Sequence, residues 1–242
     1  MRLAFGGDAP VGAVGRQRAG AQEAADLAAF LGRLVRWDKA AVVRLRSAEG
    51  EAALGVFGHP PFGGVLAVKS LPLRAGGGDV AVVDATVSAG QLLEAVAAAA
   101  EDGDGEFALP GSVTGPAWAG LLPPRGGWRR IADLDAAEVR GVAAGAVAEF
   151  RSRTEALGEA GRTRAGLDAL AEELWVREAG PGGLTLRVVH AAHGLGFLRE
   201  AAPGAVVSVL AAGPWVRLRT EFGSVAARTQ ASGASGLTVS PV

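Results

Sequence analysis

Apolar side chains recur along this chain at two spacings, and each spacing predicts a different kind of element. Spacings of three and four residues predict a helix over roughly residues 21–36, with Phe30 and Leu34 on its apolar face. From residue 41 the spacing falls to two, which is typical of strands with one buried face, and short turns separate the apolar runs. This pattern predicts four strands within residues 40–87, and their short connections favour an antiparallel meander.

The middle of the chain returns to helical spacing, and polar residues mark where the helices begin. Ser88 and Asp135 are each followed three residues later by Gln or Glu, which is the pattern of a helix N-cap. A further helix is predicted within residues 164–178. Residues 184–200 begin like a strand, but their apolar positions also fit a helix, which is the interpretation we prefer.

Strand spacing reappears near the C-terminus and decides the fold class. Residues 205–228 predict a hairpin that turns at residues 212–214, and this hairpin joins the first sheet or forms a lobe of its own. Because strands cluster near both ends, we predict an α+β fold: an antiparallel sheet, made of the four-strand meander and the C-terminal hairpin, packed with about five helices. Residues 21–228 are predicted to form a single domain. Residues 1–20 and the small-residue tail 229–242 are predicted to be flexible.

Composition and charge exclude several functional classes. The 242 residues include no cysteine, which excludes disulfides, thiolate zinc sites, iron–sulfur clusters and cysteine nucleophiles. The chain has 24 basic and 25 acidic residues, so no global field attracts nucleic acid or an anionic membrane. No apolar run is long enough to span a membrane, and the first residues lack the apolar core of a secretion signal. We therefore expect a cytoplasmic protein without nucleic-acid or membrane partners.

Three residues offer the best case for chemistry. His190 and His193 lie three apart, so a helix would present both on one face, where they could be two ligands of one metal ion. No further ligand stands at a recognisable spacing, and we expect no metal. Ser112 lies in a glycine-rich loop, but G-x-S-x-G is not matched. The alternative function is thus a small-ligand-binding protein or an enzyme with a site near His190, His193 and Ser112. No nucleotide-binding glycine motif is present, and we expect no cofactor.

The stretch Leu109–Arg130 shows neither spacing, although it holds four prolines and two tryptophans. A connection of this length without regular structure is usually functional or a packed cover. Its prolines reduce the entropy lost on ordering and its large apolar side chains favour docking, so we expect it to be ordered. It either closes the core as a lid or binds a protein partner or a second copy, through residue types enriched at interfaces. The candidate contact residues are Trp118, Leu122, Arg125, Trp128 and Arg129. We expect Trp128 to be partly exposed and to contribute little to stability.

Two stretches carry a resemblance to other proteins. At "PFGGVLAVKSLPL" and at "LLPPRGGWRRI" with "AAEVRGVAAGAVAEF", the chain resembles a conserved but uncharacterised group of actinobacterial proteins, over roughly residues 25–225. The resemblance implies a cytoplasmic protein and brings no catalytic residues with it. We therefore predict a non-catalytic interaction or regulatory protein that uses Leu109–Arg130 as its contact surface.

Overall fold

The computed structural model of this chain describes residues 2–5, 13–48, 53–73, 82–102, 106–200, 202 and 204–229. Its helices are α1 (Ala13–Trp37), α2 (Ala89–Asp102), α3 (Ala136–Ala156), α4 (Gly158–Gly161), α5 (Arg164–Trp175) and α6 (Leu186–Gly194), with the short 3-10 helices η1 (Ala117–Gly120) and η2 (Pro181–Gly183). Its strands are β1 (Arg2–Ala4), β2 (Val42–Arg46), β3 (Ala53–Gly58), β4 (Val65–Pro72), β5 (Asp84–Ser88), β6 (Glu106–Ala108), β7 (Arg129–Asp135), β8 (Glu178–Gly180), β9 (Leu184–Thr185), β10 (Val206–Ala212), β11 (Trp215–Thr220) and β12 (Gly223–Arg228).

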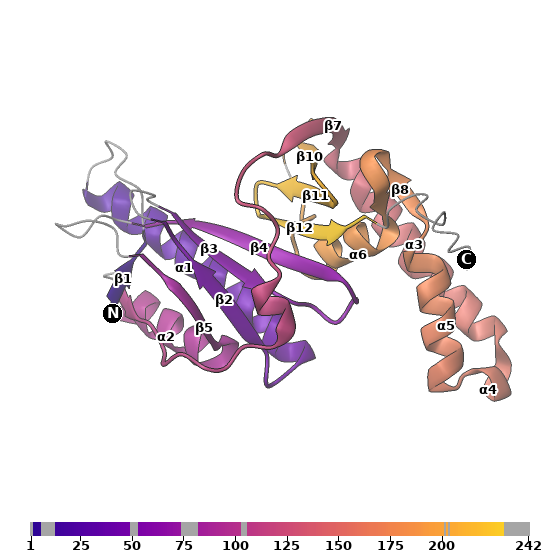
Figure 1. Cartoon of the computed structure of the whole chain (residues 1–242), viewed down its shortest axis with the longest axis horizontal. Helices are drawn as coiled ribbons and strands as arrows, with labels where there is room; N and C mark the ends of the chain where they lie inside the picture. Colours follow the sequence, from indigo (N-terminus) through magenta and orange to yellow (C-terminus); the bar gives the residue numbers. More distant parts are fainter. Residues whose placement is uncertain are drawn as a thin grey trace, which may run out of the picture.

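One antiparallel sheet of eight strands runs through the molecule, in the order β5-β2-β3-β4-β12-β11-β10-β7 (Figure 1). It consists of two meanders, β2-β3-β4 and β10-β11-β12, and each carries one extra edge strand. The two meanders meet at a seam, where Val65–Val68 of β4 pair with Ser224–Ala227 of β12. Each edge strand leads directly into a helix, β5 into α2 and β7 into α3. The sheet therefore has two similar halves on either side of the seam.

Helices cover only one face of this sheet, which we call the inner face. Val43 and Leu45 of β2 are fully buried in the main core beneath α1 and α2. Arg44 and Arg46 alternate with them and so point to the opposite, outer face, because successive side chains of a strand point to opposite sides. In the C-terminal half, α6 packs on β11 and β12. Each large apolar side chain that is fully buried contributes roughly 1.5–3 kcal/mol.

A helical arm formed by the end of α3 with α4 and α5 projects away from the sheet (Figure 1). Leu170 and Leu174 form the buried side of α5. Arg153 of α3 binds the carboxylate of Glu173 through both terminal nitrogens, at 2.8 and 2.7 Å. Because this ion pair is exposed, packing of the two leucines rather than charge holds the arm together.

The predicted α+β class is confirmed, and so are the helix starts predicted at Ser88 and Asp135. Asp135 accepts hydrogen bonds from the backbone N–H of Ala137 and Glu138 at 2.8 and 3.0 Å. The Ser88 hydroxyl accepts a longer bond, 3.4 Å, from the backbone N–H of Gln91. The strand layout fits roughly, with two differences. β5 pairs with β2 instead of extending the meander beyond β4, and the C-terminal hairpin is a three-strand meander that joins the first sheet.

The N-terminal boundary differs from the prediction. α1 begins at Ala13 rather than near residue 21, and β1 pairs with β6. Phe5 is fully buried and stacks on Phe107, with ring centroids 4.7 Å apart. The flexibility expected for residues 1–20 stays a prediction, and β1 was not found from the sequence because its apolar pattern is too short to be detected by periodicity. The predicted flexible tail lies outside the described residues after Thr229, and the single domain over residues 21–228 stays a prediction.

Candidate functional site

The segment Leu109–Arg130, which we call the strap, joins the two edges of the eight-stranded sheet. Near its start Ser112 forms an isolated bridge with Val87 of β5, and its end continues into β7 at the opposite edge. Strands lie about 4.8 Å apart, so eight strands place these edges roughly 34 Å from one another. The chain crosses the outer face to cover this distance (Figure 1). Its length and lack of periodicity follow from that path.

The first half of the strap is held by backbone and ring contacts. The N–H of Val113 donates to the carbonyl of Thr86 at 2.8 Å. Gly115 lies so close to the same threonine that an added Cβ would stand 3.0 Å from its hydroxyl. Trp118, in η1, stacks on His59 with ring centroids 5.9 Å apart and an angle of 19° between the rings. Partial burial lowers the pKa of His59, so this ring is neutral at pH 7.

The second half of the strap covers apolar side chains on the outer face. Leu66, Val68, Leu210, Ala212 and Ala226 point away from the helices, yet all are buried and none belongs to the main core. Pro123 of the strap is buried as well. The strap is therefore in part a lid over a second, smaller apolar cluster.

Trp128 fixes the end of the strap. Its indole Nε1–H donates to the carbonyl of Pro124 at 2.8 Å, which closes a tight loop ahead of β7. The Arg217 guanidinium of β11 lies over the indole, 5.4 Å from the ring centroid. The indole is partly exposed, as expected, and so is that of Trp118.

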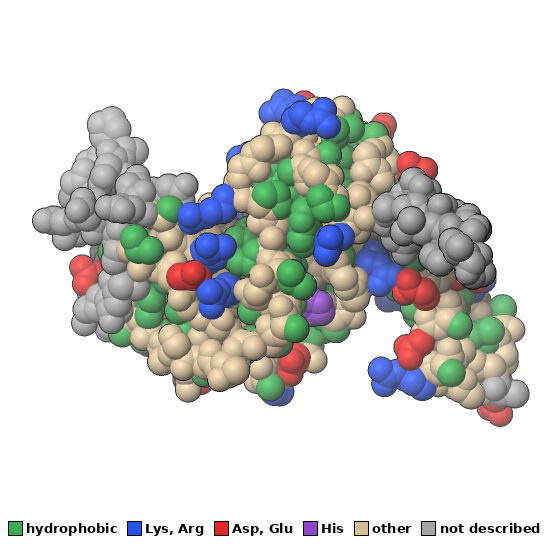
Figure 2. Space-filling model, viewed as in Figure 1, with side chains coloured by type: hydrophobic (Ala, Val, Ile, Leu, Met, Phe, Trp, Pro, Cys, Tyr) green, Lys and Arg blue, Asp and Glu red, His purple; other side chains and the backbone are tan. Residues whose placement is uncertain are grey.

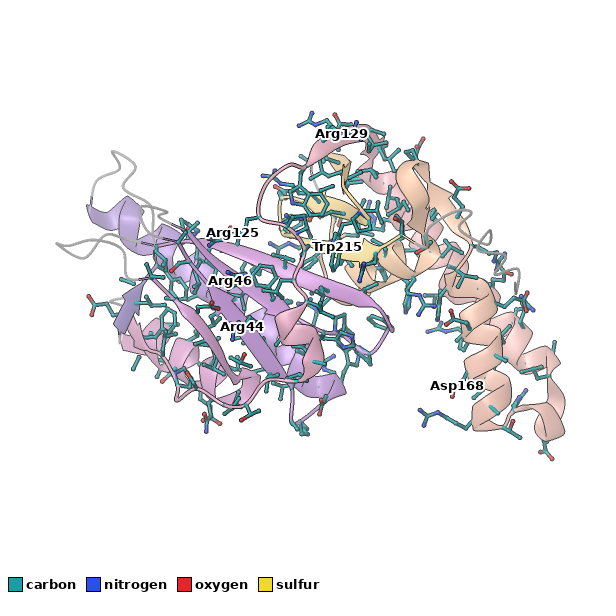
Figure 3. The ribbon with its side chains drawn as sticks, in the orientation of Figure 1. Arg44, Arg46, Arg125, Arg129, Asp168 and Trp215 are labelled. Atoms are coloured by element: carbon teal, nitrogen blue, oxygen red, sulfur yellow. The ribbon has the colours of Figure 1, made fainter. Side chains whose placement is uncertain are left out.

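Other strap residues point into solvent. Leu121 is 63% exposed and Val113 is 41% exposed, whereas Leu122 is half-buried. Figure 3 shows Arg125 beside the outer-face side chains of Arg46 and Arg44. The strap therefore presents apolar and cationic side chains on the same face.

The outer face carries a band of arginines (Figure 2). Arg44 binds Asp84 at 2.5 Å and donates to the Thr86 hydroxyl at 3.0 Å, and Arg46 lies 3.6 Å from the same aspartate. One carboxylate thus serves two guanidinium groups, and the band keeps an excess of positive charge. Arg129 stands apart from it, at the free edge where β7 begins (Figure 3).

The structure places the two histidines in different surroundings. His190, on α6, lies between Trp175, with ring centroids 4.3 Å apart, and Phe62, at 4.9 Å. Its Nδ1 is buried and has no hydrogen-bond partner in the described part of the chain. Burial, and next the charge of His193, lower the pKa of His190. His193 itself is exposed. His190 therefore packs as an aromatic side chain.

The alternative site is not assembled. Ser112 bridges to the edge strand β5, whereas His190 lies on α6, which packs on the inner face over β4, β12 and β11. Within the described ranges, no three His, Cys, Asp or Glu side chains are grouped so that they could hold a metal ion.

A cavity of about 880 Å³ lies between the start of β4, α5 and β12, and none of the predicted site residues lines it. Arg187 stands at its wall and binds both oxygens of Glu172 at 2.6 Å. The same guanidinium donates to the carbonyls of Phe62 and Gly63, at 2.9 and 3.2 Å. Sequence reasoning missed this residue, because its partners come from α5 and from the β3–β4 connection, which are far apart in the sequence.

Two family models match the chain, one after the other along the sequence. Residues 17–120 match a family described as "Domain of unknown function (DUF8010)". Residues 123–232 match a family described as "Domain of unknown function (DUF8185)". No curated protein matches the chain. These findings agree with the resemblance to uncharacterised proteins, and the boundary between the two matches falls within the strap.

One solved structure to which the chain shows a distant similarity is the "Crystal structure of DNA polymerase sliding clamp from Pseudomonas aeruginosa". The TM-score is 0.43 and the sequences are 11% identical. The match covers 89% of this chain and 64% of that one, so this chain spans less than two thirds of the length of the clamp. Among the described helices, none combines the length and the apolar character that a membrane span requires.

Proposed function

We propose that this chain is a non-catalytic, cytoplasmic interaction protein whose outer face binds an acidic segment of a partner protein along the strap. The observation that carries the proposal is the composition of one surface. The strap carries an exposed leucine, Leu121, and the partly exposed rings of Trp118 and Trp128, and a band of arginines lies on the same outer face. Tryptophan and arginine are the residue types that dominate binding energy at protein interfaces.

Charge decides which partner we propose. Arg44 and Arg46 share the single carboxylate of Asp84, and Arg125 is exposed beside them. A partner with several carboxylates would add counter-charges to this band and speed association. The balanced charge of the whole chain makes a nucleic-acid partner the poorer match, because counterion release needs a strong positive field.

A small-ligand site near His190 has less support. Trp175 stacks on its ring and Phe62 contacts it at an angle of 79°, so a ligand would compete with these two aromatic contacts. Ser112 is too far from the ring to act on the same ligand, because it lies at the β5 edge of the sheet. We therefore keep binding through the strap as the proposed function.

Site-specific photocrosslinking in a lysate of the source cells tests the proposal. A photoreactive amino acid at position 121 samples the strap, and one at Val142, which is exposed on α3, is the matched control. We expect a discrete heterologous adduct from position 121 alone. Mass spectrometry should place the crosslink in an acidic segment, and Arg125→Glu should weaken the adduct.

Three results would contradict the proposal. The first is an adduct of equal yield from position 121 and from Val142. The second is an adduct whose yield Arg125→Glu does not change. The third is an adduct composed of two copies of this chain. The last result would identify the outer face as a self-association surface.

A further inference from the structure

A polar pocket of about 250 Å³ opens at the β11–β12 turn, where β12 begins opposite Val68 and the last residues of β4 pair with β3 alone. It lies apart from the strap's exposed leucine and from the larger cavity beside α5. Three of its lining residues are cationic and three carry hydroxyl groups: Lys69, Arg217, Arg219, Ser70, Thr220 and Ser224.

Arg217 is the unusual member of this set. Its side chain is half-buried, and its Nε–H donates to the Ser224 hydroxyl at 2.8 Å. Its guanidinium group also lies over the Trp128 ring, 5.4 Å from the ring centroid. No carboxylate among the described residues forms an ion pair with it, so the two terminal nitrogens of this half-buried cation have no counter-charge. A buried charge is normally paired, because desolvation otherwise costs several kcal/mol.

A second arginine adds to this charge. Arg219 lies two residues along β11, hence on the same face of the strand, and Ser224 stands opposite it. Burial first, and then the charge of Arg219, lower the pKa of Arg217 to about 10. Glu221 also lines the pocket, but it forms no ion pair with either arginine in the ranges that the structure describes.

Lys69 is already engaged on the inner side. Its ammonium group donates to the carbonyl of Phe222 at 2.9 Å and lies 3.6 Å from Asp26. It adds positive potential to the pocket without needing a further partner. The two arginines are therefore the groups that a bound anion would satisfy.

We propose that this pocket binds one phosphate group, through the guanidinium groups of Arg217 and Arg219 and the hydroxyl of Ser224. A phosphate carries close to two negative charges and several acceptor oxygens, which match two guanidinium groups better than a single carboxylate does. The volume is below that of usual cofactor pockets, so it suits a phosphate group rather than a whole nucleotide. The source of the group is a small phosphate compound or a phosphorylated side chain. The proposal does not depend on the strap having a partner.

Calorimetric titration of the purified chain with inorganic phosphate tests this site, with sodium chloride at equal ionic strength as the reference. We expect saturable binding of one phosphate at millimolar concentration and a rise in Tm that chloride does not produce. Arg219→Gln should weaken binding by roughly tenfold or more, because it removes one charge-assisted contact. Arg228→Gln is the matched control, since this arginine is exposed on the neighbouring strand and does not line the pocket.

Arg219 is exposed and unpaired among the described residues, so its replacement leaves the fold intact. Arg217→Gln tests the half-buried guanidinium group directly and should also weaken phosphate binding. A phosphoserine peptide titrated beside free phosphate identifies the source: tighter binding of the peptide indicates a phosphorylated protein, and equal or weaker binding a small compound. The proposal is overturned if phosphate has no more effect than chloride, or if Arg219→Gln and Arg228→Gln bind phosphate equally well.

Discussion

Replacing Trp128 with alanine separates the two roles of the strap, as a lid and as a contact surface. The substitution removes an indole that is partly buried, its 2.8 Å hydrogen bond to the Pro124 carbonyl, and its contact with the Arg217 guanidinium. The strap end that this residue fixes lies on the outer face, where the buried apolar cluster includes Leu66 and Ala226.

The magnitude follows from these contacts. Truncating a fully buried tryptophan costs about 3–5 kcal/mol, and partial exposure reduces this to about half. The hydrogen bond is worth about 1 kcal/mol of that loss. We therefore expect Trp128→Ala to lower the free energy of unfolding by about 2 kcal/mol. The sequence alone suggested almost no loss, because it showed neither the carbonyl partner nor the cluster beneath the ring.

Urea unfolding of three variants measures the effect. Trp128→Phe keeps a ring but loses the indole N–H, and should cost about 1 kcal/mol. Leu121→Ala alters a side chain that is 63% exposed, and should stay within about 0.5 kcal/mol of the parent. The order of the three losses is the prediction. If Trp128→Ala costs no more than Leu121→Ala, the strap end is not a lid and the reasoning from its contacts is refuted.

Two further predictions concern stability. Gly223→Ala should lower the free energy of unfolding by roughly 3 kcal/mol or more, because the backbone there has φ of +152° and an added Cβ would lie 2.6 Å from the buried Phe197 ring. Thermal unfolding measures this loss. Gly213→Ala is the control and should lose clearly less stability, because this glycine has a positive φ but open space around it. His190 has a pKa lowered by burial and by His193, so the unfolded chain binds its proton first and stability should fall as pH drops below about 6.5. His190→Phe should flatten this part of the profile, and an unchanged slope between pH 7 and about 5 would show that the ring is not shielded.

Local chemistry made the helices and the class of the fold predictable. Ser88 and Asp135 were recognised as caps because the capping pattern lies within four residues of sequence. The alternation of Val43 and Leu45 with arginines identified a strand with one buried face. The strand order was not predictable, because alternation shows which face of β5 is buried but not which strand lies beside it.

Strand β7 and the pocket at Arg217 were missed for different reasons. β7 is an edge strand whose side chains are mostly exposed, so residues 129–135 carry little apolar alternation. Arg217 looked like an ordinary outward-facing arginine, because its burial results from the strap, which is distant in sequence. The strap itself was recognised as a segment without regular structure, but its path between the two sheet edges depends on strand pairings that form far away from it.

The seam between β4 and β12 sets the order in which this chain can fold during synthesis. Ala67 pairs with Val225, so β4 leaves the ribosome long before the strand that covers its edge. Until then the nascent chain presents an open row of backbone N–H and C=O groups, which is a template for pairing with another chain. Domains generally fold from the N-terminus as they emerge, so the first half of the sheet waits with this edge uncovered. A neighbouring nascent copy can then supply β12 in trans, which makes strand-exchanged dimers through the seam the expected product of crowded, rapid synthesis.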